Sequence, residues 1–356
     1  MSFIRKSESG TFAAYWYEGS RKRKKTFKTM AEAKRFLAIQ ELNPEQKQAR
    51  ILVSEILREY KDTETQKKKG HRPETLRIES FMRRPFAQKL ASELTVRDIE
   101  AFKDVRMTEP GRIPGTTISP SSLRKDLTLL TTIFHWAIRR GYMAKNPVTE
   151  TKKPKENEHR ERAATEKEKE LLMVACGWDG KSMPETQEQL VIAAFMFACA
   201  TGMRSGEILK LEEAWIEGRV IHIPASAIKT ESKRDVALSK EALRILNLVR
   251  QRGSAPTIFG DMSDHVRDVL YRRVRDRAGL GPVLDSQGRL IKEGLNFHDS
   301  RATFCTWAAS PDPKTGAPRL DVLALARQTG HKNLQMLQRY YRASAEEIAL
   351  RLDKSA

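Results

Sequence analysis

The sequence predicts a mainly α-helical chain with small β-sheets (α+β), organised in three successive blocks. Helical periodicity runs through residues 46–150 and returns over most of the chain after residue 163. Strand-like runs bounded by turn residues are confined to the first 45 residues and to two short segments between residues 218 and 239. We therefore expect a sheet-plus-helix domain (1–45), a helical domain (46–150), a polar linker (151–162) and a mixed α/β domain (163–356).

Composition and charge point to a folded protein with a polyanionic partner. The 356 residues are 39% hydrophobic, and 65 Lys and Arg against 46 Asp and Glu give a net charge of +19. Such a charge favours nucleic acid or an anionic membrane surface as partner. Residues 1–50 hold 12 basic and 5 acidic residues, whereas residues 163–356 hold 29 and 25. The excess therefore lies mostly ahead of the larger third block, as expected for DNA-gripping modules attached to a globular domain.

Several classes of protein are disfavoured. The longest apolar run, Leu190–Ala200, is about half of a membrane span, no basic amphipathic helix stands out, and the N-terminus lacks a signal-peptide core. We therefore expect no membrane association. The three cysteines, Cys176, Cys199 and Cys305, form no pair pattern. A reducing cytoplasm is the expected compartment.

The first block reads as a sheet followed by one helix. Residues 12–17 form an aromatic strand, Glu18-Gly19-Ser20 is a turn, and the basic run Arg21–Lys25 leads to Thr29. Thr29 is a plausible N-cap for a helix over residues 31–42.

The second block reads as helices joined by a loop. Two of its helices carry apolar stripes at helical spacing: Ile51, Leu52, Ile56 and Leu57 in one, and Val96, Ile99 and Phe102 in the other. Thr95 precedes the second stripe. A long helix runs from a Ser cap near residue 121 to Gly141, and the Pro/Gly-rich residues 109–121 form a loop before it.

The third block begins with a helix that Thr165 and Glu168 can cap reciprocally. A long apolar helix then ends at Thr201-Gly202. Two strands follow, over residues 218–225 and around residues 233–239, and the remainder reads as helices with a Gly/Pro-rich loop at 279–294.

Four separate pieces of the third block carry chemistry in common. They are TGMRSGEIL (201–209), AIKTESKRDVALS (227–239), HDSRATF (298–304) and TGHKNLQMLQRYYR (329–342). Taken singly, each has an ordinary explanation as a solvated charge, a helix cap, a helix stop or a core aromatic residue. Their order and spacing together are far more specific.

In that order the four pieces resemble the tyrosine recombinase, or phage integrase, family over roughly residues 163–345. The family pattern is an Arg after a Thr-Gly turn with Glu at i+3, then a hairpin Lys, His-x-x-Arg, Gly-His, and a Tyr nine residues beyond that His. The sequence supplies all of them in order: Arg204, Glu207, Lys229, His298, Arg301, His331 and Tyr340.

The resemblance implies DNA cleavage and rejoining through a 3′-phosphotyrosine link. Arg204 and Arg301 would clamp the phosphate, because a guanidinium presents a planar donor fork to phosphate oxygens. Tyr340 would be the nucleophile, and a Tyr hydroxyl with a pKa near 10 needs a proton acceptor, for which His298 is the candidate. Adjacent helical residues point about 100° apart, so Tyr341 is the rival of Tyr340. Spacing from His331 favours Tyr340.

The remaining roles complete this expected site. Lys229 would protonate the leaving 5′-oxygen, with Lys233 and Arg234 as rivals on the same hairpin. His331 would hydrogen-bond the phosphate, and Glu207 would orient its neighbours. The phosphotyrosine retains the bond energy, so neither ATP nor another cofactor is expected. The sequence shows no phosphate-binding loop and no acidic metal cluster, so a metal site is not expected.

The resemblance extends more diffusely to the first two blocks. Residues 1–45 are similar to an arm-type DNA-binding domain, and residues 46–150 to a core-binding domain that closes a clamp around duplex DNA. The expected arm contacts are Arg21, Lys22, Arg23, Lys24 and Lys25, with a solvated basic hairpin as the alternative. The implied partners are double-stranded DNA, a homotetramer on synapsed sites, and accessory DNA-bending or excision factors. The amphipathic tail, residues 345–354, can pack on its own domain or on a neighbouring protomer. Ser300 stands where the family commonly has a larger apolar residue.

Two other functions share these features. A type IB topoisomerase uses the same chemistry, although it needs no second DNA-binding domain. A non-catalytic DNA-binding regulator would be expected to have lost Tyr340 or an Arg, and neither is lost. A site-specific recombinase that integrates or excises a mobile element is the function that the sequence favours.

Overall fold

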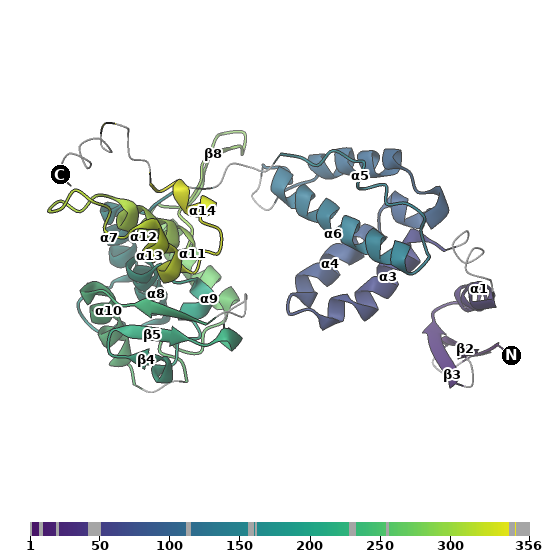
Figure 1. Ribbon diagram of the computed structural model, residues 1–356, viewed down its shortest axis with the longest axis horizontal. Helices are drawn as coiled ribbons and strands as arrows, with labels where there is room; N and C mark the ends of the chain where they lie inside the picture. The colour runs from purple at the N-terminus through teal and green to yellow at the C-terminus, as the bar shows by residue number, and fades with distance from the viewer. Residues whose placement is uncertain are drawn as a thin grey trace. The chain divides into compact units, whose positions relative to one another are not determined.

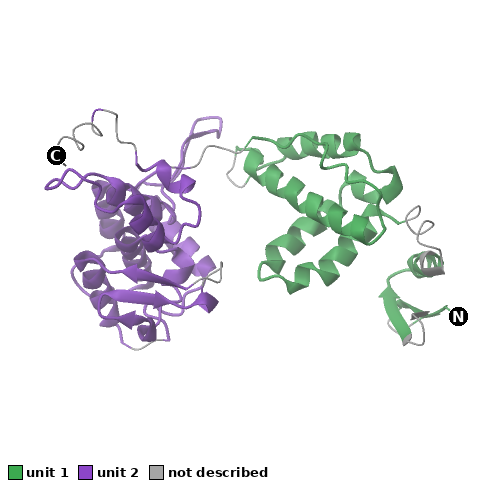
Figure 2. Cartoon of the chain, in the orientation of Figure 1, with its two compact units in different colours: residues 1–158 green, residues 159–356 purple. Residues whose placement is uncertain are grey.

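The computed structural model describes residues 2–6, 10–18, 21–41, 51–111, 115–155, 160, 162–227, 233–253, 256–341 and 346. The chain divides into two compact units, residues 1–158 and 159–356 (Figure 2). Helices predominate and the sheets are small and antiparallel, which confirms the predicted fold class (Figure 1). Within the described ranges, no helix is long and apolar enough to cross a membrane.

The first block is a three-stranded antiparallel sheet covered on one face by a helix. Its elements are β1 (Phe3–Lys6), β2 (Phe12–Glu18), β3 (Arg21–Phe27) and α1 (Met30–Glu41). A small core of Ala14, Ala33 and Leu37 joins sheet and helix. Thr29 caps α1 as predicted, because its hydroxyl accepts the Glu32 N–H and the Glu32 carboxylate accepts the Thr29 N–H, both at 3.2 Å.

The described part of the second block packs four α-helices around a separate core. They are α3 (Val53–Thr63), α4 (His71–Met82), α5 (Val96–Thr108) and α6 (Pro120–Arg139). Ser119 caps α6, and its hydroxyl accepts the Ser122 N–H at 3.2 Å. The prediction that Ile51 and Leu52 belong to the first helix is wrong. Leu52 is extended and its N–H donates to the Glu55 carboxylate at 2.9 Å, so Leu52 is the N-cap and α3 begins at Val53.

The second unit is built around one helix that is buried on all sides. Its helices are α7 (Glu166–Cys176), α8 (Gln187–Thr201), α9 (Ser205–Ile208), α10 (Lys240–Arg250), α11 (Asp264–Arg277), α12 (Asp299–Ala309), α13 (Val322–Thr329) and α14 (Gln335–Gln338). Helices α7, α10, α11 and α12 all pack against α8, which explains its uninterrupted apolar sequence. Thr165 and Glu168 cap α7 reciprocally, as predicted.

Two small sheets complete the second unit. The first has the order β4 (Ile216–Glu217), β5 (Val220–Ile223) and β6 (Arg234–Ala237), of which the sequence predicted β5 and β6. The second is a hairpin of β7 (Val283–Leu284) and β8 (Leu290–Lys292) in the segment predicted to be a loop. The Asp285 carboxylate stabilises this hairpin by accepting the N–H groups of Gln287 and Arg289 at 2.9 and 2.8 Å. These two hydrogen bonds close the turn, so the segment forms two paired strands and not an irregular loop.

Candidate active site

The turn between α8 and α9 presents Arg204. Gly202 ends α8 in the left-handed region (φ +69°), and a Cβ there would lie 2.5 Å from the Phe304 ring. Arg204 follows in extended conformation as the N-cap of α9. Glu207, whose side chain is only 4% exposed, accepts the Arg204 backbone N–H at 2.8 Å and its Nη1 at 3.1 Å. The Arg204 guanidinium is therefore oriented by a buried carboxylate while remaining 37% exposed.

The start of α12 presents His298 and Arg301. Arg301 is buried, and its Nη1 donates to the Gly202 carbonyl at 2.6 Å. Burial, followed by the nearby Arg204 guanidinium, lowers the pKa of Arg301 to about 10. Shielding from water, followed by the Arg301 charge, also lowers the pKa of His298, although the His298 residue still reaches solvent. His298 is thus held neutral near pH 7 and able to accept a proton. Ser300 is buried and its hydroxyl donates to the Phe297 carbonyl at 2.6 Å, so a small polar side chain is accommodated here.

His331 contacts Arg301, and the carbonyl just before it accepts a hydrogen bond from Arg204. It follows Gly330, which ends α13 in the left-handed region (φ +70°). The Arg301 Nη2 lies 3.2 and 3.3 Å from the two ring nitrogens of His331, and the Thr329 hydroxyl lies 2.6 Å from Nδ1. Arg204 Nη2 donates to the Gly330 carbonyl at 3.1 Å. Burial, and then the Arg301 and Arg204 charges, lower the pKa of His331 to about 3.

The two adjacent tyrosines lie just after α14, although the sequence predicted that they lie within a helix. Both are half-buried and pack against a small core that includes Phe304 and Leu337. The Tyr341 hydroxyl donates to the Leu320 carbonyl at 2.7 Å, and burial raises its pKa to about 12. The Arg339 guanidinium lies 5.9 Å from the centre of the Tyr340 ring. The environments of the two side chains therefore differ: a backbone carbonyl holds the Tyr341 hydroxyl, whereas a guanidinium lies beside the Tyr340 ring.

The candidate proton donors lie between the end of β5 and the start of β6 in the sequence. Lys229 lies in residues 228–232, outside the described part of the chain. Lys233 is exposed. The Arg234 side chain is 9% exposed, and its Nη2 donates to the same Glu207 carboxylate that holds Arg204. Arg234 is therefore fixed in the interior by Glu207, which argues against it as the residue that delivers a proton to DNA.

One contact of the site was not predictable from the motifs. Asp299, 4% exposed and next to His298, accepts Arg160 Nε at 2.7 Å and Arg160 Nη2 at 2.6 Å. The backbone N–H of Ala164 donates to the Thr303 hydroxyl at 2.8 Å. Arg160 and Ala164 therefore hold the end of the linker along the first turns of α12. No local pattern links residues that lie 139 positions apart.

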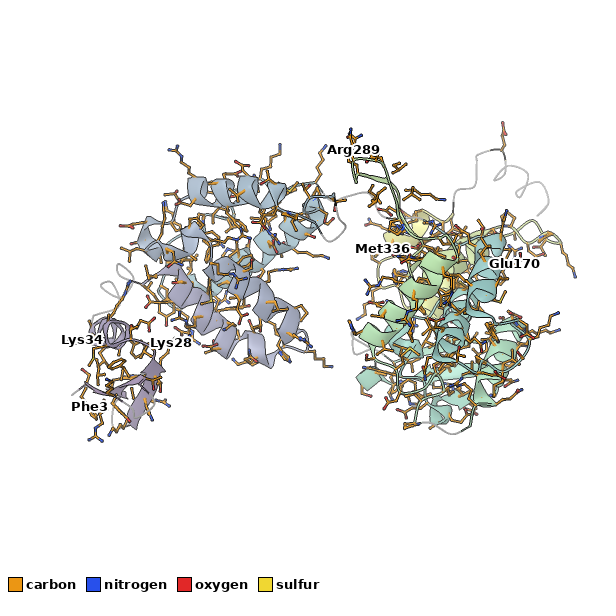
Figure 3. The ribbon with its side chains drawn as sticks, turned by 180° about the vertical axis from the view of Figure 1, so that it is seen from behind. Phe3, Lys28, Lys34, Glu170, Arg289 and Met336 are labelled. Atoms are coloured by element: carbon orange, nitrogen blue, oxygen red, sulfur yellow. The ribbon has the colours of Figure 1, made fainter. Side chains whose placement is uncertain are left out.

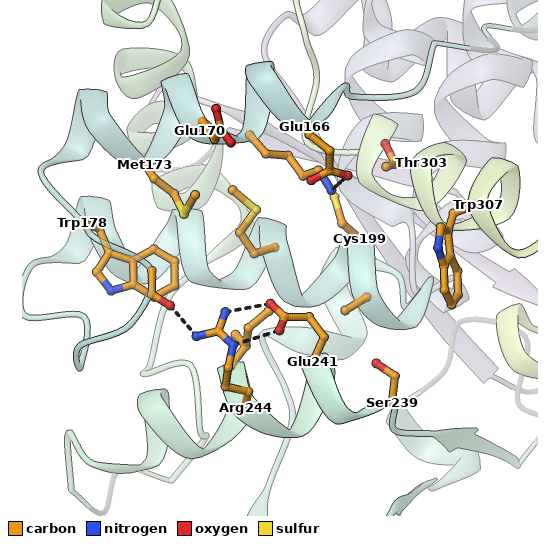
Figure 4. Close-up of a pocket in the computed structure, with 15 residues that line it drawn as sticks. Glu166, Glu170, Met173, Trp178, Cys199, Ser239, Glu241, Arg244, Thr303 and Trp307 are labelled. Atoms are coloured by element: carbon orange, nitrogen blue, oxygen red, sulfur yellow. Dashed lines mark hydrogen bonds and ion pairs between the residues drawn. The ribbon is translucent and has the colours of Figure 1, made fainter. Parts of the chain in front are cut away.

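A pocket of about 420 Å³ lies elsewhere in the second unit, between α7, α8 and α10 (Figure 4). Its lining includes Met173, Trp178 and Cys199, and the Arg244–Glu241 ion pair at 2.7 Å. Burial raises the pKa of Cys199 to about 12, so its thiol stays protonated near pH 7. The pocket contains none of the expected catalytic residues, and it is not the candidate site.

The basic run of the first block is divided between the two faces of its sheet. Lys22 Nζ lies 5.0 and 4.9 Å from the ring centres of Phe3 and Tyr15, and Lys24 lies 5.8 Å from Tyr15. These rings stack at 4.8 Å on the face opposite α1. Two other basic residues, Arg23 and Lys25, lie on the α1 side, since their cross-strand partners Trp16 and Ala14 pack there. The Arg21 side chain is outside the described part. Figure 3 shows Phe3 on the sheet, with Lys28 and Lys34 at the helix.

The geometry brings several nitrogen donors together. Arg301 and Arg204 donate to the carbonyls of Gly202 and Gly330, and Arg301 also contacts the His331 ring. Burial lowers the pKa of His298, which lies close enough for the charges of both arginines to lower it further. Such a set can hold the non-bridging oxygens of a phosphate and stabilise the charge that develops during transfer.

Comparison with known proteins identifies matching sequences and folds. Residues 163–347 match the model of the phage integrase family. The chain is 30% identical to a shufflon-specific DNA recombinase of Escherichia coli, over 85% of this chain and 72% of that protein. It is 28% identical to a putative integrase/recombinase of Haemophilus influenzae, over 88% of this chain and 94% of the relative.

Solved structures show the same fold at lower identity. A lambda integrase dimer bound to a COC′ core site has a TM-score of 0.64 at 17% identity, covering 95% of this chain and 94% of that one. The Tn1549 transposon integrase in complex with circular intermediate DNA has a TM-score of 0.64 at 17% identity, covering 86% and 100%.

Proposed function

Because the chain belongs to the phage integrase family and is thus a tyrosine site-specific recombinase, we propose that it integrates or excises a mobile element through a 3′-phosphotyrosine link to Tyr340. The observation that carries the proposal is the junction of Arg204, Arg301 and His331 at the Gly202 and Gly330 carbonyls. These residues come from three separate motifs and meet in one anion site. The shufflon-specific recombinase, at 30% identity, supports site-specific recombination as the reaction class.

The proposed cleavage is a transesterification. The Tyr340 Oη forms a bond to phosphorus while the bond from phosphorus to the 5′-oxygen breaks. The Tyr340 proton passes to His298, whose lowered pKa leaves it neutral and able to accept. The 5′-oxygen leaves as a hydroxyl after taking a proton from Lys229. Ligation is the reverse reaction with the 5′-hydroxyl of another strand, and the retained bond energy makes ATP unnecessary.

The electrostatic stabilisation of the phosphorane is assigned to Arg204, Arg301 and His331. The phosphorane carries more negative charge than the starting diester, so donors already in place lower the barrier. The Arg204 side chain is 37% exposed whereas Arg301 is buried, so we assign Arg204 to direct contact with the phosphate. Arg301, anchored on Gly202, supports both the phosphate and His331.

We propose double-stranded DNA and further copies of the chain as partners. The structural neighbours include lambda integrase bound as a dimer to a core site and as a tetramer to a Holliday junction. A homotetramer on two synapsed sites accounts for the need to exchange four strands. Accessory DNA-bending or excision factors would act on this complex, in the cytoplasm.

The first unit supplies the proposed DNA-gripping surfaces. The face of the N-terminal sheet opposite α1 combines Phe3 and Tyr15 with Arg5, Lys22 and Lys24, a mixture suited to phosphates and sugars. We assign it to an arm-type DNA site. The helices α3 to α6 would form the core-binding domain that closes around the duplex with the second unit.

The experiment that tests the function is covalent trapping. The protein is mixed with fragmented host and element DNA, the reaction is stopped with SDS, and DNA attached to protein is sequenced. Adducts at one recurring sequence with a 3′-phosphate link support a recombinase. Adducts at many unrelated sequences indicate a topoisomerase, and DNA binding without adducts indicates a regulator.

A further inference from the structure

Arg234, which the sequence offered only as a rival to Lys229, lies buried beside Glu207 in the candidate site. Its side chain is 9% exposed, against 37% for Arg204. It pairs with Glu207, which is itself 4% exposed. A guanidinium buried this deeply is poorly placed to contact DNA directly. Arg234 would therefore contribute to phosphate binding through the residues that it holds or through its charge.

The Glu207 carboxylate is shared between two arginines. One oxygen accepts both the Arg204 backbone N–H at 2.8 Å and the Arg234 Nη2, while the other accepts Arg204 Nη1 at 3.1 Å. Without Arg234, Glu207 loses the second guanidinium that holds its carboxylate in place. The orientation of Arg204 therefore depends on Arg234 through one shared carboxylate.

Arg234 also lies against the backbone that leads into His331. A Cβ on Gly330 would meet Arg234 Nη1 at 2.5 Å and its Cδ at 3.0 Å. Gly330 is therefore required for its positive φ and for this close approach.

Nearby, the Gln328 amide group of α13 accepts the Ala237 N–H and donates to the Ala237 carbonyl, both at 3.0 Å. Strand β6 and helix α13 are thus held together at two points.

The charges around Arg234 do not balance. Arg204 and Arg234 share the Glu207 carboxylate, which also lies close enough to Arg301 to influence its charge. In the described part of the chain, no other carboxylate forms an ion pair with these three arginines. Among the described residues, no acceptor pairs with the buried Nε and Nη1 of Arg234. Burying an unpaired N–H of a charged group is unfavourable, so the site is short of negative charge. A phosphodiester bound at this site would add negative charge.

We propose that Arg234 is a positioning residue of the phosphate site, which holds Arg204 through Glu207 and adds a third positive charge behind Gly330 and His331. This inference rests on the proposed function, because its effect on rate presumes phosphoryl transfer. The contact between Arg234 and Glu207 does not depend on catalysis. Arg234 lies five residues after Lys229 in the sequence, so it anchors the strand that follows the expected proton donor.

The test compares Arg234→Met with a matched control, Arg275→Met. The Arg275 side chain is also 9% exposed and ion-paired, to Asp276 at 2.7 Å, but it belongs to α11 and not to the site. Single-turnover cleavage is measured on the DNA sequence recovered by trapping, alongside the affinity for that DNA. We expect Arg234→Met to cleave about 100-fold more slowly than Arg275→Met, as for loss of one preorganised charge contact, with a much smaller change in affinity. Arg234→Lys, which keeps the charge but not the planar fork, should recover part of the rate.

A second readout separates failure of this inference from failure of the proposed function. The His331 ring resonance, identified with His331→Gln, is titrated by NMR in the full-length protein. Arg234 is one of the charges that lower the pKa of His331. Arg234→Met should therefore raise that pKa, and Arg275→Met should not. Equal cleavage rates and equal His331 titrations in the two variants would overturn the inference. If the wild-type protein forms no adduct, the proposed function fails, and the titration alone decides the place of Arg234.

Discussion

The Tyr341 hydroxyl donates a hydrogen bond to the Leu320 carbonyl at 2.7 Å, in the residue directly after the expected nucleophile, Tyr340. Tyr341 is committed to the backbone ahead of α13, and burial raises its pKa to about 12. Attack on phosphorus would require breaking that bond and removing a more tightly held proton. This relationship favours Tyr340 as the nucleophile and gives Tyr341 a structural role.

Tyr341→Phe should keep cleavage activity and lose stability. The change removes one hydrogen bond and leaves the Leu320 carbonyl without that donor, a loss of about 1 kcal/mol in the free energy of unfolding. Urea unfolding measures this loss, and SDS trapping measures activity. A variant as stable as wild type but unable to form adducts would contradict the assignment.

Arg301→Met should reduce cleavage strongly. Arg301 links the Gly202 carbonyl to the His331 ring, so its loss removes a phosphate donor and releases His331. We expect a decrease of about 100- to 1000-fold in the single-turnover rate, the range observed when one preorganised donor is removed. A decrease smaller than about tenfold would place the phosphate elsewhere.

Stability should fall as the pH decreases, partly because of His331. An unfolded His binds a proton near pH 6.5, whereas the folded His331 has a pKa lowered to about 3. Between these values the unfolded chain binds more protons, so acid favours unfolding in that window, and His331 contributes no further change above it. The melting temperature of wild type should therefore drop more between pH 7 and pH 5 than that of His331→Gln. Parallel curves for the two proteins would rule out this contribution.

The sheet face opposite α1 should account for binding to arm-type DNA. Lys22→Ala/Lys24→Ala removes two charges from that face, and Lys28→Ala/Lys34→Ala removes two exposed charges near the helix (Figure 3). The first pair should lower the slope of log affinity against log salt by about 2, since each phosphate contact contributes about 0.9. The second pair should leave the slope nearly unchanged. Equal slopes for both pairs would remove the proposed distinction between the faces.

The Arg160–Asp299 pair should stabilise the start of α12. Arg160→Met leaves a buried carboxylate beside His298, with a cost on the order of 2 kcal/mol to the free energy of unfolding. Adding Asp299→Asn removes that charge and should recover part of the loss. Urea unfolding of the single and double variants measures the coupling. Additive losses in the double variant would show that the pair does not act as a unit.

The sequence predicted those parts of the fold that local patterns encode. The N-cap at Thr29, the reciprocal cap at Thr165 and the end of α8 at Gly202 follow from residue types at fixed spacing. The β7–β8 hairpin was missed, because a Gly/Pro-rich segment reads as a loop unless the Asp285 turn contacts are known.

The motifs name the expected site residues, but they do not predict the contacts that those residues make. The motifs supplied Arg204, His298, Arg301, His331 and Tyr340 in order. The shared use of Glu207 by Arg234 and the hold of Arg160 on Asp299 join residues that are far apart in the sequence. Neither contact leaves a spacing pattern in a single sequence, so only the folded structure identifies them.

The most direct test of Tyr340 as the nucleophile is to identify the residue that carries the nucleotide. The trapped complex is digested with nuclease and trypsin, and the nucleotide-bearing peptide is sequenced by mass spectrometry. We expect a nucleotide attached through its 3′-phosphate to Tyr340, and no adduct from Tyr340→Phe. A nucleotide on Tyr341, or adducts that persist in Tyr340→Phe, would show that Tyr340 is not the nucleophile.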